Sequence, residues 1–120
     1  MLAIAGAGAV GAVSRYLVGL LVAGLLPGWP LATLVVNVVG CFGFGLCWSL
    51  GHGRWAALTE VAVLVGFFGA FTTFSSFAFD GHALWEQRRT GALFANLALQ
   101  NGLGLLAMWG GVTAGRALVA

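Results

Sequence analysis

The sequence predicts an all-α integral membrane protein with four transmembrane helices. Of its 120 residues only 5 are Lys or Arg and 3 are Asp or Glu, whereas a soluble domain carries about 25% charged residues. Hydrophobic residues make up 61% of the chain, which also excludes a disordered protein. The apolar residues form continuous stretches of about 20 residues, the length of a membrane-spanning helix, and do not alternate as in a barrel. The length allows a single membrane domain over residues 1–120.

Four spans follow one another along this domain. We expect the first at about residues 2–26, ended by a turn at 27–30 that contains two prolines. The second covers about 31–50 and contains no charge, the third covers about 55–79, and the fourth about 92–115. The most polar stretch, 80–90, connects the last two spans. Glycines recur in the spans, and because Gly lets helices approach closely in lipid, we expect a compact bundle.

The basic residues are balanced across the membrane. Arg54 and Arg116 fall on the side of both termini, Arg88 and Arg89 on the other side, and Arg15 inside the first span. The positive-inside rule assigns no orientation to such a chain. We therefore predict dual topology with antiparallel pairing of two copies; the alternative is one dominant orientation whose cause is not visible in the sequence. A net charge of +2 without a basic stripe does not favour nucleic-acid binding.

The third span contains a polar stretch, Gly-Phe-Phe-Gly-Ala-Phe-Thr-Thr-Phe-Ser-Ser-Phe, at residues 66–77. Thr and Ser pairs lower helix propensity and can cap a new helix, so we predict a break between Gly69 and Thr73. Carbonyls freed by a break can hold a cation, and freed N–H groups attract an anion. The alternative is a continuous helix in which the hydroxyls bond to carbonyls four residues earlier.

Amide and aromatic side chains within the spans are further candidates for an ion path. Asn37 lies in the second span, and Asn96 and Gln100 are one helical turn apart in the fourth. Each of these amides has two N–H donors that suit an anion. Phe74 and Phe77 share a helical face and can present electropositive ring edges. The alternatives are interhelical hydrogen bonds for the amides and core or lipid-facing positions for the rings.

The charged residues of the spans contain no catalytic arrangement. Arg15 can reach the interface or place positive potential at a pore mouth. The spans hold no nucleophile–base pair and no metal-binding triad. An enzyme is therefore not expected.

Three stretches resemble the Fluc (CrcB) family of fluoride channels, and the resemblance covers nearly the whole chain. They are Gly-Ala-Val-Ser-Arg-Tyr at 11–16, Thr-Leu-Val-Val-Asn-Val-Val-Gly-Cys-Phe at 33–42, and the polar stretch at 66–77. The resemblance implies an antiparallel, dual-topology homodimer in the cell membrane, with two pores through which fluoride leaves the cell passively, relieving its toxicity.

The resemblance also implies roles for individual residues. One central sodium ion is held by backbone carbonyls of Gly69 and Thr72 from both subunits. Arg15 lies near a pore vestibule, together with Asp80, which stands where we expect a Glu. Asn96 and Gln100 stand where a Tyr and a Ser are commoner. The expected pore-lining residues are Asn37, Thr73, Phe74, Ser76, Phe77, Asn96 and Gln100.

Two other functions remain as alternatives. A small multidrug-resistance-type, proton-coupled exporter also has four short spans and antiparallel dimers, but it relies on a Glu in its first span. The first span of this chain has no carboxylate and contains Arg15 instead. A structural membrane subunit without transport activity is the third possibility.

Overall fold

The computed structural model describes residues 1–27 and 30–120, so part of the predicted turn at 27–30 lies outside the described residues. Within them the chain is helical without strands, and 4 helical segments are long and apolar enough to cross a membrane. The first two are α1 (Leu2–Leu25) and α2 (Leu31–Gly51), and the fourth is α6 (Thr90–Val119). The third comprises α3 (Ala57–Val61), the π-helical segment η1 (Ala62–Phe68), α4 (Gly69–Phe71) and α5 (Phe74–Glu86). The predicted all-α membrane class is therefore confirmed.

The last two spans extend further than the sequence predicts. α5 continues to Glu86 and α6 begins at Thr90, so most of the expected 80–90 connection is helical. Gly81 and Leu84 are buried, and Gly81 faces Leu93 of α6, so packing between the two helices favours continuation of α5. The turn is confined to 87–89, where Arg88 adopts a positive φ of 56°.

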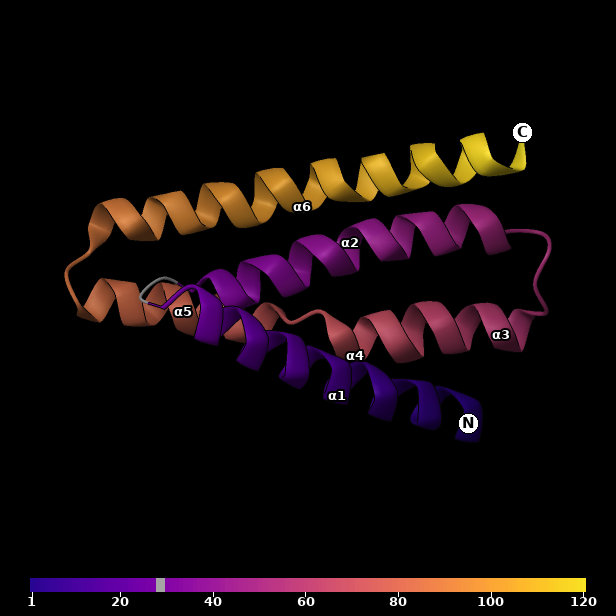
Figure 1. Cartoon of the computed structure of the whole chain (residues 1–120), viewed down its shortest axis with the longest axis horizontal. Coiled ribbons are helices and arrows are strands. Elements are labelled where there is room, and N and C mark those ends of the chain that lie inside the picture. Colours follow the sequence, from indigo (N-terminus) through magenta and orange to yellow (C-terminus); the bar gives the residue numbers. More distant parts are fainter. Residues whose placement is uncertain (28–29) are drawn as a thin grey trace.

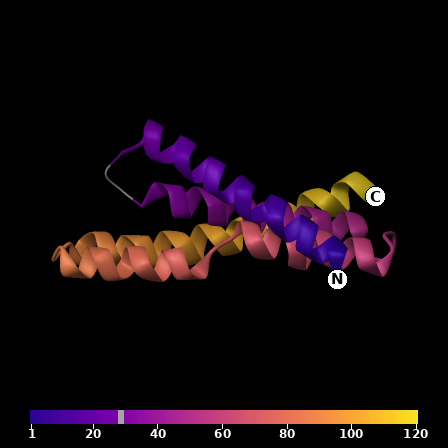
Figure 2. The same ribbon diagram turned by 90° about the horizontal axis from the view of Figure 1, so that it is seen from below.

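The helices lie lengthwise in a molecule that measures 49 × 31 × 22 Å. α6 runs along α2, and both termini lie at the same end as the connection between α2 and α3 (Figure 1). The connection between α5 and α6 lies at the opposite end. Figure 2 shows α1 crossing the other helices obliquely, so that its C-terminal end lies away from α5 and α6 at that opposite end.

The buried apolar core is small, and most large apolar side chains face outward. This distribution suits a protein in lipid, where apolar surface needs no burial and only the backbone must be satisfied by helices. Packing between α2 and α6, and between α1 and η1, makes up most of the interior. The core side chains are Val22, Leu34, Val36, Leu64, Phe68, Phe71, Phe77 and Leu84.

Several glycines lie where two helices touch, as predicted. A Cβ atom at Gly111 would overlap the carbonyl of Phe42, and one at Gly11 would overlap the carbonyl of Phe67. Small residues therefore set the approach of α6 to α2 and of α1 to η1. Gly19 and Gly102, in contrast, have open space around them, so close packing within one chain does not explain every glycine.

Candidate functional site

The polar stretch of the third span is not helical throughout. α4 ends at Phe71, Thr72 is extended with a ψ of 159°, and Thr73 is extended with φ −150° and ψ 110°. Thr73 is the N-cap of α5: its Oγ1 accepts a hydrogen bond from the Ser76 N–H at 3.2 Å and donates one to the Ser76 hydroxyl at 3.0 Å. The N–H groups in the first turn of a helix have no carbonyl partner within that helix, and here the Thr73 hydroxyl supplies the acceptor for one of them.

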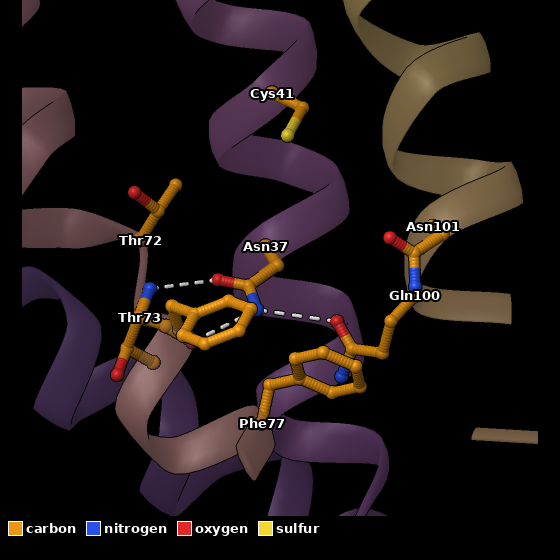
Figure 3. A pocket seen from close by; sticks show the side chains of 8 residues that line it. Asn37, Cys41, Thr72, Thr73, Phe77, Gln100 and Asn101 are labelled. Atoms are coloured by element: carbon orange, nitrogen blue, oxygen red, sulfur yellow. Dashed lines mark hydrogen bonds between the residues drawn. The ribbon is translucent and has the colours of Figure 1, made fainter. Parts of the chain in front are cut away.

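Asn37 of α2 joins the interruption to α6. Its Oδ1 accepts the N–H of Thr73 at 2.8 Å. Its Nδ2 donates to the Thr73 carbonyl at 3.1 Å and to Oε1 of Gln100 at 3.1 Å. Figure 3 shows this amide lying between the extended segment and α6. The amide therefore satisfies both backbone groups of Thr73, which would otherwise be costly at membrane depth.

A pocket of about 230 Å³ opens beside this junction. The rings of Phe74 and Phe77 meet edge to face there, with centroids 5.5 Å apart and planes at 71°. Phe77 is buried at 9% exposure, whereas Phe74 is 78% exposed in the single chain. The pocket therefore combines amide, hydroxyl and aromatic-edge groups without a formal charge. Its lining consists of Asn37, Cys41, Thr72, Thr73, Phe74, Phe77, Gln100 and Asn101.

Two amides of α6 are buried with unsatisfied polar atoms. Asn96 has 0% exposure, and neither Nδ2 nor Oδ1 has a hydrogen-bond partner among the described residues. Gln100 has 7% exposure, and its Nε2 also finds no partner within this part of the chain. Native proteins leave few buried polar groups unpaired, so these atoms indicate a polar ligand or water at this face of α6.

A second, smaller pocket of about 130 Å³ contains Arg15 together with Thr73 and Ser76. Thr73 lines both pockets, so the two adjoin at the interrupted segment. Asp80, one turn beyond Ser76 on α5, has a buried Oδ2 without a hydrogen-bond partner in residues 1–27 and 30–120, and it lines neither pocket. The predicted site residues thus divide into an amide–aromatic group and an arginine–hydroxyl group that meet at Thr73.

Gly40 and Cys41 share a face of α2 with Asn37, and both contribute to the site although the sequence assigns neither of them a role there. Cys41 lines the pocket one turn after Asn37, whereas its apolar surroundings indicate only a small buried side chain. A Cβ at Gly40 would overlap the Thr72 side chain, so this glycine lets α2 reach the interruption. The feature of the sequence that points to both residues is their spacing of three and four from Asn37, which places them on the same face of α2.

Comparison with known proteins assigns the chain to a family. The family of CrcB-like proteins, Camphor Resistance (CrcB), matches residues 2–112. The chain belongs to this family. With four candidate spans in the part of the chain that the structure describes, it is a multi-pass membrane protein.

The chain is similar to several curated relatives that carry the name fluoride-specific ion channel FluC. The relative from Solidesulfovibrio magneticus is 47% identical over 116 residues, covering 94% of this chain and 93% of that protein. The relative from Desulforapulum autotrophicum is 45% identical with the same coverage. The relative from Paracoccus denitrificans is 40% identical over 113 residues, covering 94% and 91% of the two chains.

In this CrcB-like chain, two backbone carbonyls at the interruption do not receive the N–H that a continuous α-helix would give them. In a continuous helix the Gly69 carbonyl would accept the Thr73 N–H, which instead bonds to Asn37. The Thr72 carbonyl would accept the Ser76 N–H, which instead bonds to the Thr73 hydroxyl. Uncharged carbonyls of interrupted helices coordinate Na⁺ in membrane proteins. The residues present therefore fit a sodium ion.

Proposed function

We propose that this protein is a passive, fluoride-selective channel that lets fluoride leave the cell. The observation that carries the proposal is the uncharged pocket of amides and ring edges beside an interrupted span. Membership of the CrcB-like family and the names of the relatives support it. The residues proposed to line the ion path are Asn37, Thr73, Phe74, Ser76, Phe77, Asn96 and Gln100.

The chemistry of the pocket suits a small, hard anion. Fluoride is strongly hydrated, so its path must replace water with hydrogen-bond donors, and amide and hydroxyl groups are such donors. The edges of Phe74 and Phe77 add a weakly positive surface. Because none of these groups holds a full charge, each binds weakly enough to release the ion to the next.

Two antiparallel copies form the proposed channel. The balanced arginines support insertion in both orientations. Phe74, a proposed pore residue, is 78% exposed in the single chain, which is consistent with a second copy completing the path. The dimer offers two symmetric paths.

A sodium ion at the dimer centre is the proposed structural cofactor, held by the Gly69 and Thr72 carbonyls of both copies. A cation there would also lower the barrier for an anion nearby. Replacing sodium by N-methylglucamine throughout purification is expected to lower the thermal unfolding temperature of the dimer. An unchanged temperature would contradict a structural sodium ion.

Arg15 and Asp80 are proposed to lie at the vestibule of the path. A positive side chain there raises the local anion concentration. Arg15→Gln is therefore expected to reduce fluoride flux more at low than at high fluoride concentration. An equal reduction at both concentrations would contradict this role.

The driving force is the membrane potential. Neutral HF crosses the bilayer and dissociates inside, and an inside-negative potential of 100 mV favours anion exit by about 2.3 kcal/mol per charge. Neither ATP nor a proton gradient is needed. A fluoride electrode on proteoliposomes is expected to record efflux once valinomycin supplies a countercurrent of K⁺. Absence of valinomycin-dependent efflux would overturn the proposed function.

No observation favours the proton-coupled exporter. α1 contains no carboxylate that could exchange protons for cations, and Arg15 repels a cationic substrate. The same proteoliposomes are expected to show no collapse of a pH gradient when an organic cation is added.

A further inference from the structure

A third pocket lies at the turn between α5 and α6. It measures about 370 Å³ and is lined by Trp85, Glu86, Arg88 and Thr90. None of these residues lines the pocket beside Asn37. Figure 1 shows the turn at the end of the helical bundle that is opposite to both termini. This pocket is therefore separate from the proposed ion path.

The position of the turn places the pocket at the level of the lipid headgroups. The hydrocarbon core of a bilayer is about 30 Å thick, and the headgroup regions bring the total to about 40–45 Å. The molecule is 49 Å long, so its two ends reach the headgroup regions. Trp85 is 61% exposed at this end, and such tryptophans are typical of the interface between lipid and water. A ligand of the pocket is therefore a group of the membrane surface.

The pocket contains one charge of each sign. Glu86 supplies a carboxylate, which accepts hydrogen bonds, and Arg88 supplies a guanidinium group, which donates them. Both residues are exposed, and among the described residues neither side chain takes part in an ion pair. Both charges are therefore available to a ligand that has a negative and a positive group of its own.

The backbone of Arg88 indicates that its side chain has a function. Arg88 has a φ of 56°, in the left-handed region that is unfavourable for residues other than glycine. The Arg88 N–H bonds to the Trp85 carbonyl and the Arg89 N–H to the Leu84 carbonyl, both at 2.9 Å, and these bonds close the end of α5. Glycine is the usual residue at such a helix end. A strained arginine in its place points to a role for the guanidinium group.

We propose that this pocket binds the headgroup of phosphatidylethanolamine. Arg88 binds the phosphate, because the paired N–H groups of a guanidinium match two phosphate oxygens. Glu86 accepts hydrogen bonds from the ammonium group, and the ring of Trp85 lies beside the start of the acyl chains. The inference goes beyond the fluoride function and does not depend on it, since none of these residues belongs to the proposed ion path.

The two charges distinguish this headgroup from two other common ones. Phosphatidylglycerol has a phosphate but no positive group, so it leaves Glu86 without a partner close to a second negative charge. Phosphatidylcholine has a positive group without N–H donors, so it cannot donate a hydrogen bond to Glu86. Phosphatidylethanolamine supplies both the phosphate and the N–H donors. It is therefore expected to bind most tightly of the three.

Native mass spectrometry of the full chain, released from detergent micelles, tests this order of binding. The three lipids are added in equal amounts and with identical acyl chains. The chain is expected to retain phosphatidylethanolamine about fivefold more than either of the others, because it forms additional hydrogen bonds to a charged group. Equal retention of the three lipids would overturn the proposal.

Replacing one charge at a time tests the two halves of the headgroup. Glu86→Gln removes the negative charge at similar volume and is expected to change the preference to phosphatidylglycerol. Arg88→Gln is expected to lower the retention of all three lipids. Arg116→Gln, which removes an arginine from the last turn of α6, is the control and is expected to keep the wild-type preference. A Glu86→Gln variant with the wild-type preference would contradict the role of the carboxylate.

Arg88→Gly separates the side chain from the turn. Glycine adopts a positive φ without strain, so the unfolding temperature in detergent without added lipid is expected to be equal or higher. The retention of phosphatidylethanolamine is nevertheless expected to fall to the level of Arg88→Gln. Wild-type retention by Arg88→Gly would contradict phosphate binding by Arg88. If this variant misfolds, the lipid preference of Glu86→Gln still decides.

A soluble analogue distinguishes a lipid from a free phosphate ester. Glycerophosphoethanolamine has the same headgroup but no acyl chains, so an equal concentration is expected to leave the bound lipid in place. Displacement of the lipid by this analogue would contradict a site for a membrane lipid.

Discussion

Individual polar residues in this protein differ in how many of their hydrogen-bond donors and acceptors are already used within the protein. Asn37 uses both its donors and its oxygen within the protein, whereas Gln100 keeps a buried NH₂ group free. Thr73 combines an extended backbone with a side chain that caps α5. Residues of similar chemistry therefore have different roles because their neighbours differ.

Replacement of Phe77 tests the aromatic edge of the proposed path. Phe77→Ile keeps an apolar side chain but removes the electropositive ring edge, so fluoride efflux is expected to fall about tenfold. Phe79→Ile is the matched control, because Phe79 lies on the same helix, is 68% exposed and does not line the pocket. Equal efflux from both variants would argue against a role for the Phe77 ring.

Replacement of Thr73 tests the cap of α5. Thr73→Val preserves the side-chain shape and tolerates the extended backbone, but it leaves the Ser76 N–H without its acceptor. The free energy of unfolding in mixed micelles is expected to fall by about 1 kcal/mol. Thr73→Ser keeps the hydroxyl and is expected to retain most of the stability. A Thr73→Val variant as stable as the wild type would show that the cap contributes nothing.

At the scale of the elements, the third span differs from the others. It passes from a short α-helix through seven π-helical residues, Ala62–Phe68, to a second short helix before the extended threonines. Departures from α-helical geometry of this kind concentrate at functional sites. The straight α2 and α6 pack along each other and hold Asn37 and Gln100 at the distance of a hydrogen bond.

The contact between α2 and α6 can be tested at one glycine. Gly111→Ala places a Cβ against the Phe42 carbonyl, so the backbones must separate, and stability in mixed micelles is expected to fall by about 1–3 kcal/mol. Gly102→Ala, on the same helix in open space, is the control and is expected to leave stability unchanged or slightly higher. Equal effects would show that α2 does not limit residue size at position 111.

At the scale of the whole molecule, arginine residues lie at both ends of the helical bundle. Both termini and the connection between α2 and α3 share one end, where Arg54 donates to the Val119 carbonyl at 3.4 Å (Figure 1). Arg88 lies at the other end, in the turn between α5 and α6. The balance of two arginines against two is the basis of the proposed dual topology.

Accessibility labelling tests dual topology. His52, whose side chain is 67% exposed, is replaced by Cys in a chain that lacks Cys41 and Cys47. A membrane-impermeant thiol reagent is expected to label this position about equally from the two sides of the membrane, because in the proposed dual topology half of the copies face each way. Adding Arg88→Gln and Arg89→Gln removes the balance and is expected to give labelling from one side. One-sided labelling of the balanced chain would contradict an antiparallel dimer.

Much of this protein follows from its sequence alone, for a simple physical reason. Lipid offers no hydrogen bonds, so long apolar stretches with few charges must form helices, and the described residues contain four such helical segments. The hydroxyl-rich stretch also pointed to the residues around Thr72 and Thr73, because their side chains compete with helical hydrogen bonds. α5 extends further than the sequence predicts, because its polar last turns pack against α6.

Only the tertiary structure decided which polar groups are satisfied and which are free. Asn37 and Gln100 are 63 residues apart, and nothing in either local sequence shows that one accepts a hydrogen bond from the other. The same holds for Gly40, whose close approach to Thr72 depends on how α2 lies against the third span. Hydrogen-bonding capacity is a property of a residue type, but whether a donor remains free for an ion depends on the neighbours that the fold supplies.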